Sequence, residues 1–232
     1  MKLSKIPLFR FCYSEIRNSI MSRNGSQPFG EYIYSSTGQT VKNRKEYRIP
    51  MPNLTRALNP VLRQFIDLHG LGKRCLLVSE SNSVKQVYQR YFPDVEFVTC
   101  DNFPELMPST GQTNSVDVKW DVCCPPPEQF IDNKFDAVIS HAVLEHVIAP
   151  TTAIVNLFSI CAPRGFVYIM TCTPSFHYHA FPRDYVRFHH DYFFDLPAFI
   201  KQQTGMDVQL LELFSCQGLI SMCFHKGPVL HA

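Results

Sequence analysis

The side chains best suited to chemistry are polar residues that close or follow short apolar runs. Asp101 follows one run, Asp121 closes a second, and Ser140 and His141 end a third. A carboxylate accepts hydrogen bonds from hydroxyl groups, and histidine titrates near neutral pH. At the carboxyl ends of parallel strands, such groups share the sheet edge where nucleotide-type cofactors bind. Aspartate is also common in turns, so a structural role for Asp101 and Asp121 stays open.

A second group of reactive side chains lies in residues 176–191, which hold four histidines, two aspartates and two arginines. We favour a substrate-binding lid, since loops at such an edge carry function. A packed loop without chemistry is one alternative. A metal held by His177, His179 and either His189 or His190 is the other, but the segment offers no evident fourth ligand, so we expect no metal.

Apolar runs and helical spacings alternate along the chain from residue 74 onwards. This alternation predicts a doubly wound α/β fold, with a mainly parallel seven-stranded sheet, helices on both faces and a C-terminal antiparallel edge hairpin. The expected strands are 75–78, 95–99, 116–122, 135–140, 166–171, 207–214 and 219–225. The expected helices are 54–69, with Asn53 as N-cap and Gly70 as stop, 83–91, 151–161, and 190–203 before Gly205.

Composition and charge define the class of protein. The 232 residues are 45% hydrophobic, enough for one core, which we assign to 54–232, with 1–53 as a partly irregular N-terminal arm. The net charge of +2 favours a small-molecule substrate over nucleic acid. No apolar run reaches the ~20 residues of a membrane span. The oligomeric state is left open.

Cysteine usage and the first twenty residues bear on the compartment. The nine cysteines, several within expected strands, favour a reducing environment. Arg10, Glu15 and Arg17 interrupt the apolar core that a signal peptide needs. We therefore expect an intracellular, cytoplasmic protein, with a mitochondrial presequence as the weaker alternative.

Two motifs in the second half of the chain carry a family resemblance. Phe135-Asp-Ala-Val-Ile-Ser is followed by Val143-Leu-Glu-His-Val, and then by Ala162-Pro-Arg-Gly. Together they resemble the class I S-adenosylmethionine-dependent methyltransferases, types 11 and 12. The resemblance runs from about residue 74 to the C-terminus and includes the loop 174–188.

The resemblance implies S-adenosylmethionine as cofactor and a role for several residues. Asp101 would bind the ribose hydroxyls, Asp121 and Val122 would contact the adenine, and Ser140 and His141 would face the methionine moiety and the methyl group. The family has a glycine-rich turn after its first strand. Here Ser79, Ser81 and Ser83 stand in place of the glycines and Leu77 in place of the usual acid, while Glu80 would be a displaced carboxylate for the ammonium group.

The serine residues in the glycine-rich turn leave two functions open. In an active methyltransferase, the candidates for a base at the acceptor are His141, His177 and His179. Glu145 and His146 more plausibly hold the helix start and the neighbouring loop. The alternative is a catalytically inactive, methyltransferase-like binding or scaffold protein, because three Cβ atoms in the serine turn narrow the cofactor pocket.

Overall fold

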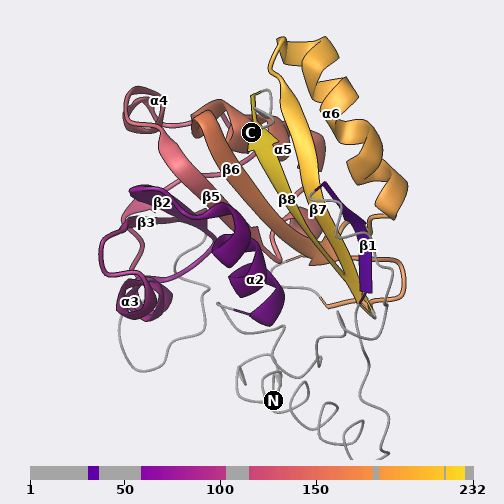
Figure 1. The fold of residues 1–232 in the computed structure, drawn as a ribbon, viewed down its shortest axis with the longest axis horizontal. Coiled ribbons are helices and arrows are strands. Elements are labelled where there is room, and N and C mark those ends of the chain that lie inside the picture. The colour runs from indigo at the N-terminus through magenta and orange to yellow at the C-terminus, as the bar shows by residue number, and fades with distance from the viewer. Residues whose placement is uncertain (1–30, 37–58, 103–114, 180–182, 217, 228–232) are drawn as a thin grey trace, which may run out of the picture.

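The computed structural model describes residues 31–36, 59–102, 115–179, 183–216 and 218–227. They form one eight-stranded sheet with helices on both faces (Figure 1). The strand order is β1-β7-β8-β6-β5-β2-β3-β4. The strands are β1 (Glu31–Ser35), β2 (Arg74–Val78), β3 (Glu96–Asp101), β4 (Val118–Lys119), β5 (Phe135–His141), β6 (Cys161–Cys172), β7 (Val208–Cys216) and β8 (Leu219–Lys226). The helices are α2 (Pro60–His69), α3 (Asn82–Tyr91), α4 (Glu128–Asp132), η4 (Leu144–His146), α5 (Pro150–Ile160) and α6 (His190–Thr204).

The predicted doubly wound α/β fold is confirmed. The pairings from β4 through β3, β2 and β5 to β6 are all parallel. The predicted C-terminal hairpin is also present, and its second strand, β8, inserts antiparallel between β6 and β7. Helix α5 and the chain around it supply a crossover between β5 and β6, as parallel neighbours require.

The strand count differs from the predicted seven, because an eighth strand comes from the segment assigned to the N-terminal arm. Strand β1 pairs antiparallel with the outer edge of β7. It covers backbone groups that an edge strand would otherwise leave unpaired. The Tyr34 ring also meets Phe194 of α6 edge-to-face, with ring centroids 6.0 Å apart. The boundary at residue 53 stays a prediction, but part of the arm belongs to the sheet.

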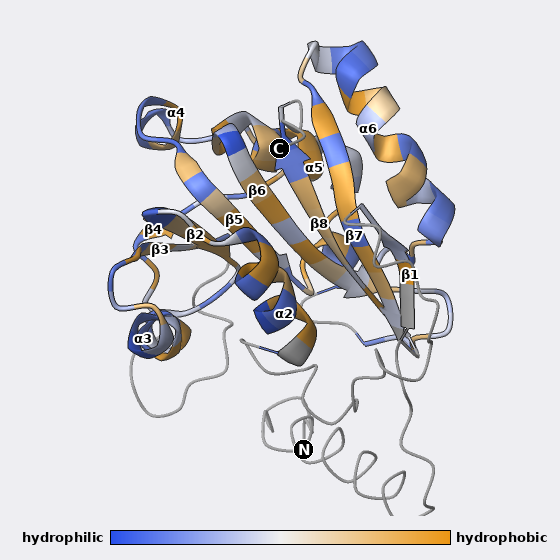
Figure 2. Cartoon of the chain, in the orientation of Figure 1, coloured by the Kyte–Doolittle hydropathy of each residue, from blue (hydrophilic) through white to orange (hydrophobic). Residues whose placement is uncertain are grey.

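Two apolar layers hold the fold together. Figure 2 shows that the central strands are largely hydrophobic, as expected for a sheet covered on both faces. One layer packs Phe130, Leu157 and Leu196, from α4, α5 and α6, against the sheet. The other packs Phe65 of α2 and Tyr88 of α3 on the opposite face.

Local signals account for most element ends. Helix α2 has Asn59 as its N-cap, whose side chain accepts the Leu62 N–H at 2.8 Å, and it ends at Gly70 as predicted. The expected cap Asn53 lies outside the described residues. Helix α6 ends at Gly205, which takes a left-handed conformation. Gly165 lies inside β6, where the pairing with β5 shifts register, and it leaves no room for a side chain, since a Cβ there would lie 2.7 Å from the Asp136 carbonyl oxygen.

Candidate active site

The register of the parallel strands brings the predicted site residues to one edge. Val78 of β2 is paired with both Cys100 of β3 and Ser140 of β5. The residues that follow these three, Ser79, Asp101 and His141, therefore lie in one row at the carboxyl ends of β2, β3 and β5. This arrangement places an acidic and an imidazole group at the ends of the two strands that flank β2, as predicted for a cofactor edge.

Ser79 occupies the conformation that glycine would favour. Its φ is 60°, its N–H donates to the Cys100 carbonyl at 2.7 Å, and its hydroxyl donates to the Asp101 carboxylate. A left-handed conformation costs a non-glycine residue roughly 1–2 kcal/mol. The contacts to β3 therefore stabilise a glycine-like turn at a position that serine occupies.

The other two serines of the turn lie further out. Ser81 is the N-cap residue of α3, with φ −81° and no capping hydrogen bond from its side chain. Its hydroxyl instead meets that of Ser83 at 2.6 Å. These two side chains contact each other rather than the Asp101 carboxylate, so Ser79 is the serine that interacts with the predicted ribose acid.

Glu80 adds a second carboxyl group beside Asp101. Burial raises the pKa of Glu80 to about 8, and the nearby charge of Asp101 adds to the shift. A cationic ligand beside Glu80 would oppose this shift, because a nearby positive charge favours the charged form of a carboxyl group. This setting suits the ammonium contact predicted for Glu80.

Asp121 and Val122 make local contacts at the end of the short strand β4. Asp121 accepts the Cys123 N–H at 2.9 Å through one oxygen and the Asn102 side chain at 3.0 Å through the other. Val122 is buried in the core. The expected strand 116–122 is only Val118–Lys119, because the chain turns at Asp121. Contact of Asp121 and Val122 with an adenine stays a prediction.

Ser140 and His141 are buried at the end of β5. Within the part of the chain that the structure describes, the Ser140 hydroxyl oxygen has no hydrogen-bond partner. Burial lowers the pKa of His141 to about 4, so its imidazole is neutral at neutral pH. A neutral ring is a weak base, but it does not repel a cation.

Glu145 connects the turn after β5 to the loop after β6. Its carboxylate is fully buried and accepts the Thr171 hydroxyl at 2.8 Å and the Cys172 thiol at 3.2 Å. Its backbone carbonyl accepts the Tyr185 N–H at 2.8 Å. These contacts agree with the structural role expected for the Leu-Glu-His motif, since a buried carboxylate needs hydrogen-bond donors.

The loop after β6 is organised around an ion pair. Both oxygens of Asp184 accept hydrogen bonds from Arg187, which also donates to the His177 carbonyl at 3.0 Å. Asp184 accepts the His179 N–H at 2.7 Å as well. The Arg187 hydrogen bonds hold the pKa of Asp184 well below its usual range. These contacts join the described residues before position 180 to those after position 182. This part of the loop is well packed, whether or not it binds a substrate.

The predicted catalytic histidines separate into different environments. The exposed His177 ring stacks on Phe176, with centroids 4.7 Å apart. The His179 ring meets His146 edge-to-face at 4.9 Å, and its Nε2 lies 3.9 Å from a Glu145 carboxylate oxygen. Burial lowers the pKa of His179. His189 and His190 begin α6 and are not part of this group. The sequence predicted that the Leu-Glu-His motif and the histidine-rich segment 176–191 lie at one edge of the sheet. It did not predict that His179 contacts Glu145 and His146.

Comparison with known proteins identifies a domain family and a fold. Residues 81–169, from the start of α3 into β6, match the type 11 methyltransferase domain family. These residues therefore carry a methyltransferase domain, and the chain has the fold of S-adenosylmethionine-dependent methyltransferases. Comparison with curated proteins gives no match.

Two solved structures illustrate the similarity of this methyltransferase domain to known folds. A SAM-dependent methyltransferase from Archaeoglobus fulgidus is 14% identical, with a TM-score of 0.50, over 72% of this chain and 91% of the other. The 1,6-didemethyltoxoflavin-N1-methyltransferase from Burkholderia thailandensis is 14% identical, with a TM-score of 0.51, over 74% and 79%. The latter was solved with 1,6-didemethyltoxoflavin and S-adenosylhomocysteine bound.

Among the described residues, no helix is long and apolar enough to cross a membrane.

Proposed function

We propose that this protein is an S-adenosylmethionine-dependent methyltransferase that acts on a small-molecule acceptor. The observation that carries the proposal is the Ser79 turn. Its backbone has the left-handed conformation of a glycine turn, and its hydroxyl donates a hydrogen bond to Asp101, the acid predicted to bind ribose. A bound ribose would offer hydroxyl groups to Asp101 in place of the Ser79 hydroxyl.

The charges at the edge fit a cationic cofactor. Asp101 and Glu80 supply acidic groups, and His141 supplies a buried ring that is neutral at neutral pH. The Ser140 hydroxyl, which lacks a partner among the described residues, is available to a ligand that reaches the end of β5. These groups favour a ligand with positive charge and hydrogen-bonding groups.

The chemistry requires the protein chiefly to position the acceptor. S-adenosylmethionine, when bound, supplies a methyl group on a sulfonium that is already a good leaving group. This chain then has to orient the acceptor and exclude water. With a pKa of about 4, His141 is a weak base, so removal of an acceptor proton is assigned to His177 or His179. The net charge of +2 supports a small molecule rather than nucleic acid.

One observation favours the alternative of an inactive binding or scaffold protein. The Ser79 hydroxyl already donates a hydrogen bond to the Asp101 carboxylate, and the serine Cβ atoms take up space that glycine would leave to a ligand. Calorimetric titration with S-adenosylmethionine or S-adenosylhomocysteine separates the two functions. We expect heat of binding and thermal stabilisation of the chain. If the chain shows no heat of binding and no thermal stabilisation at millimolar ligand, the methyltransferase function is excluded.

Replacing Ser79 with glycine is expected to tighten S-adenosylmethionine binding about fivefold. The change removes a Cβ and frees Asp101 from a competing hydrogen bond, together worth about 1 kcal/mol. The measurement is the dissociation constant by calorimetry. The matched control is Ser81→Gly, because Ser81 has an ordinary φ and contacts Ser83. Equal affinities of both variants and the unsubstituted chain would show that Ser79 does not limit binding.

A further inference from the structure

Three potential metal ligands converge beside the proposed cofactor edge. Glu145 and His146 come from η4, and His179 comes from the loop after β6. One ligand atom from each lies within 4.8 Å of those of the other two. Glu145 is fully buried, whereas His146 and His179 are partly exposed, so the group is closed on the protein side and open towards solvent.

The hydrogen bonds of both histidines favour the tautomer that a metal ligand needs. Nδ1 of His146 lies within hydrogen-bond distance of the Arg183 carbonyl oxygen. A carbonyl only accepts, so this Nδ1 carries a proton, and in the neutral ring Nε2 then has the free lone pair. Metal-binding histidines in proteins are oriented in this way by a second partner.

His179 shows the same arrangement. Its Nδ1 lies 3.3 Å from the His177 carbonyl and 3.5 Å from an Asp184 oxygen, both acceptors. The Arg187 Nη2 is also near, at 3.4 Å, but donates at 3.0 Å to the His177 carbonyl. With the proton on Nδ1, the Nε2 lone pair faces the Glu145 carboxylate oxygen at 3.9 Å. Two acceptors that face each other are stabilised by a cation between them.

The hydrogen bonds that the buried Glu145 carboxylate accepts come from neutral groups. Among the described residues its donors are Thr171 and Cys172, and the nearby Arg187 guanidinium is hydrogen-bonded to Asp184. A carboxylate removed from water needs a counter-charge or a metal. The Thr171 hydroxyl also fixes the orientation of the carboxylate, which is how second partners support a metal site.

We propose that Glu145, His146 and His179 bind a divalent transition-metal ion through a carboxylate oxygen and the two Nε2 atoms. Two imidazoles and one carboxylate suit Zn²⁺, Co²⁺ or Fe²⁺, and three protein ligands leave a position open for water or substrate. His146 and His179 are partly exposed, so that position would be reached from the solvent side. The site differs from the set expected from sequence, which combined His179 with His177 and His189 or His190. The proposal stands independently of methyl transfer.

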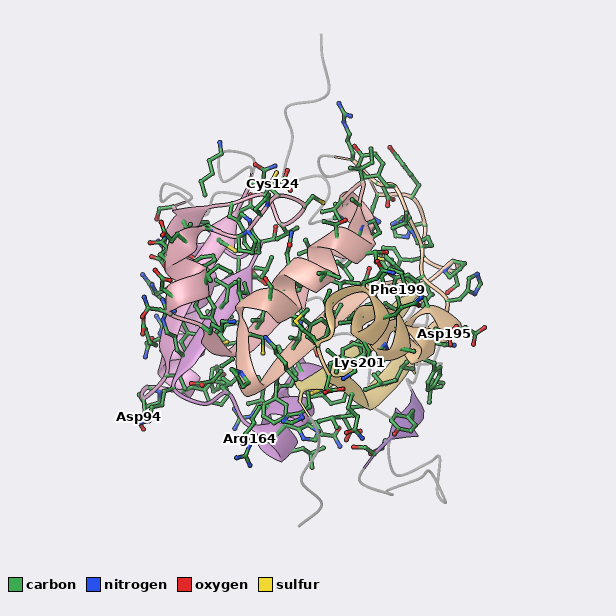
Figure 3. All side chains as sticks on the ribbon, turned by 90° about the horizontal axis from the view of Figure 1, so that it is seen from above. Asp94, Cys124, Arg164, Asp195, Phe199 and Lys201 are labelled. Atoms are coloured by element: carbon green, nitrogen blue, oxygen red, sulfur yellow. The ribbon has the colours of Figure 1, made fainter. Side chains whose placement is uncertain are left out.

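The test is a titration of metal-free, full-length protein with Co²⁺, followed by calorimetry and visible absorption. We expect one equivalent to bind, with weak d–d bands and without a thiolate-to-cobalt charge-transfer band. The absence of that band matters because the chain has free cysteines, including Cys124, which is exposed and lies at the periphery in Figure 3. A charge-transfer band, or no binding at micromolar to millimolar Co²⁺, would overturn the proposal.

Substitutions identify the ligands. His146→Asn, His179→Asn and Glu145→Gln are each expected to lower Co²⁺ affinity at least about tenfold. His177→Asn is the matched control, since the exposed His177 ring lies outside the group. Glu145→Gln keeps the size of the side chain and an acceptor for Thr171, so the variant stays folded, which circular dichroism checks. If the three ligand variants bind Co²⁺ as tightly as His177→Asn does, the metal site is refuted. Failure of the chain to bind S-adenosylmethionine would contradict the proposed function but not the metal site.

Discussion

Replacing Arg187 with alanine is expected to lower the free energy of unfolding by about 3 kcal/mol. The Asp184 side chain is only 1% exposed, and its charge is balanced by Arg187, which is 18% exposed. Loss of Arg187 leaves a buried carboxylate without its counter-charge and removes donors from the His177 and Phe176 carbonyls. Urea unfolding followed by circular dichroism measures the change, as a lower midpoint at similar slope.

The control for this prediction lies in the same loop. Arg183 is exposed, and its guanidinium contacts the Tyr185 hydroxyl at 3.4 Å, so Arg183→Ala should change stability by less than about 0.5 kcal/mol. Similar losses in both variants would contradict a dominant role for the Asp184 ion pair.

Lowering the pH should reduce the difference in the free energy of unfolding between the Arg187→Ala variant and the parent chain. In the folded chain the pKa of Asp184 lies well below its unfolded value, chiefly because of the Arg187 hydrogen bonds. The stabilisation is therefore complete above the unfolded pKa of about 3.9 and is lost as the pH falls towards the folded pKa. A stability difference that stays constant from pH 7 to pH 3 would show that the charge of Asp184 is not its cause.

Replacing Asp101 with alanine is expected to weaken S-adenosylmethionine binding by about 1–3 kcal/mol, roughly five- to 150-fold. On the proposed function, Asp101 accepts the ribose hydroxyls, and charge-assisted hydrogen bonds of this kind carry such energies. Calorimetric titration measures the dissociation constant. Asp101→Asn, which preserves the shape and an acceptor for Ser79, should lose less affinity than Asp101→Ala.

The control for Asp101 is an acid away from the edge. Asp94 is exposed in the turn between α3 and β3 and lies at the periphery in Figure 3. Asp94→Ala should therefore leave the affinity unchanged. An unchanged affinity in Asp101→Ala would show that the ribose contact is misplaced, even if the chain binds the cofactor.

The order and type of the elements could be predicted from sequence because they depend on neighbouring residues. Helical spacing, Gly70 and Gly205 mark two helices, and apolar runs mark the strands that the sheet contains. Alternation of strand and helix then implies parallel pairing, which places strand ends at one edge. The prediction that Asp101, Ser140 and His141 lie at one edge of the sheet required no further information.

Contacts between distant segments decided the rest. The pairing of β1 with β7 depends on an uncovered strand edge, and the hydrogen bond from Asn102 to Asp121 joins residues 19 positions apart in the chain. Neither contact follows from local pattern. Likewise, the left-handed φ of Ser79 is stabilised by Cys100 and Asp101, about twenty residues away in the chain.

The sequence by itself determined a methyltransferase-like sheet and the edge where its polar residues gather. Only the tertiary structure decided which of these residues meet. Glu145 and His179 are joined because the loop after β6 folds back onto η4, held by Asp184, Arg187 and the Glu145 carbonyl. Periodicity is a property of near neighbours along the chain, whereas the path of a loop depends on the sum of its long-range hydrogen bonds and ion pairs.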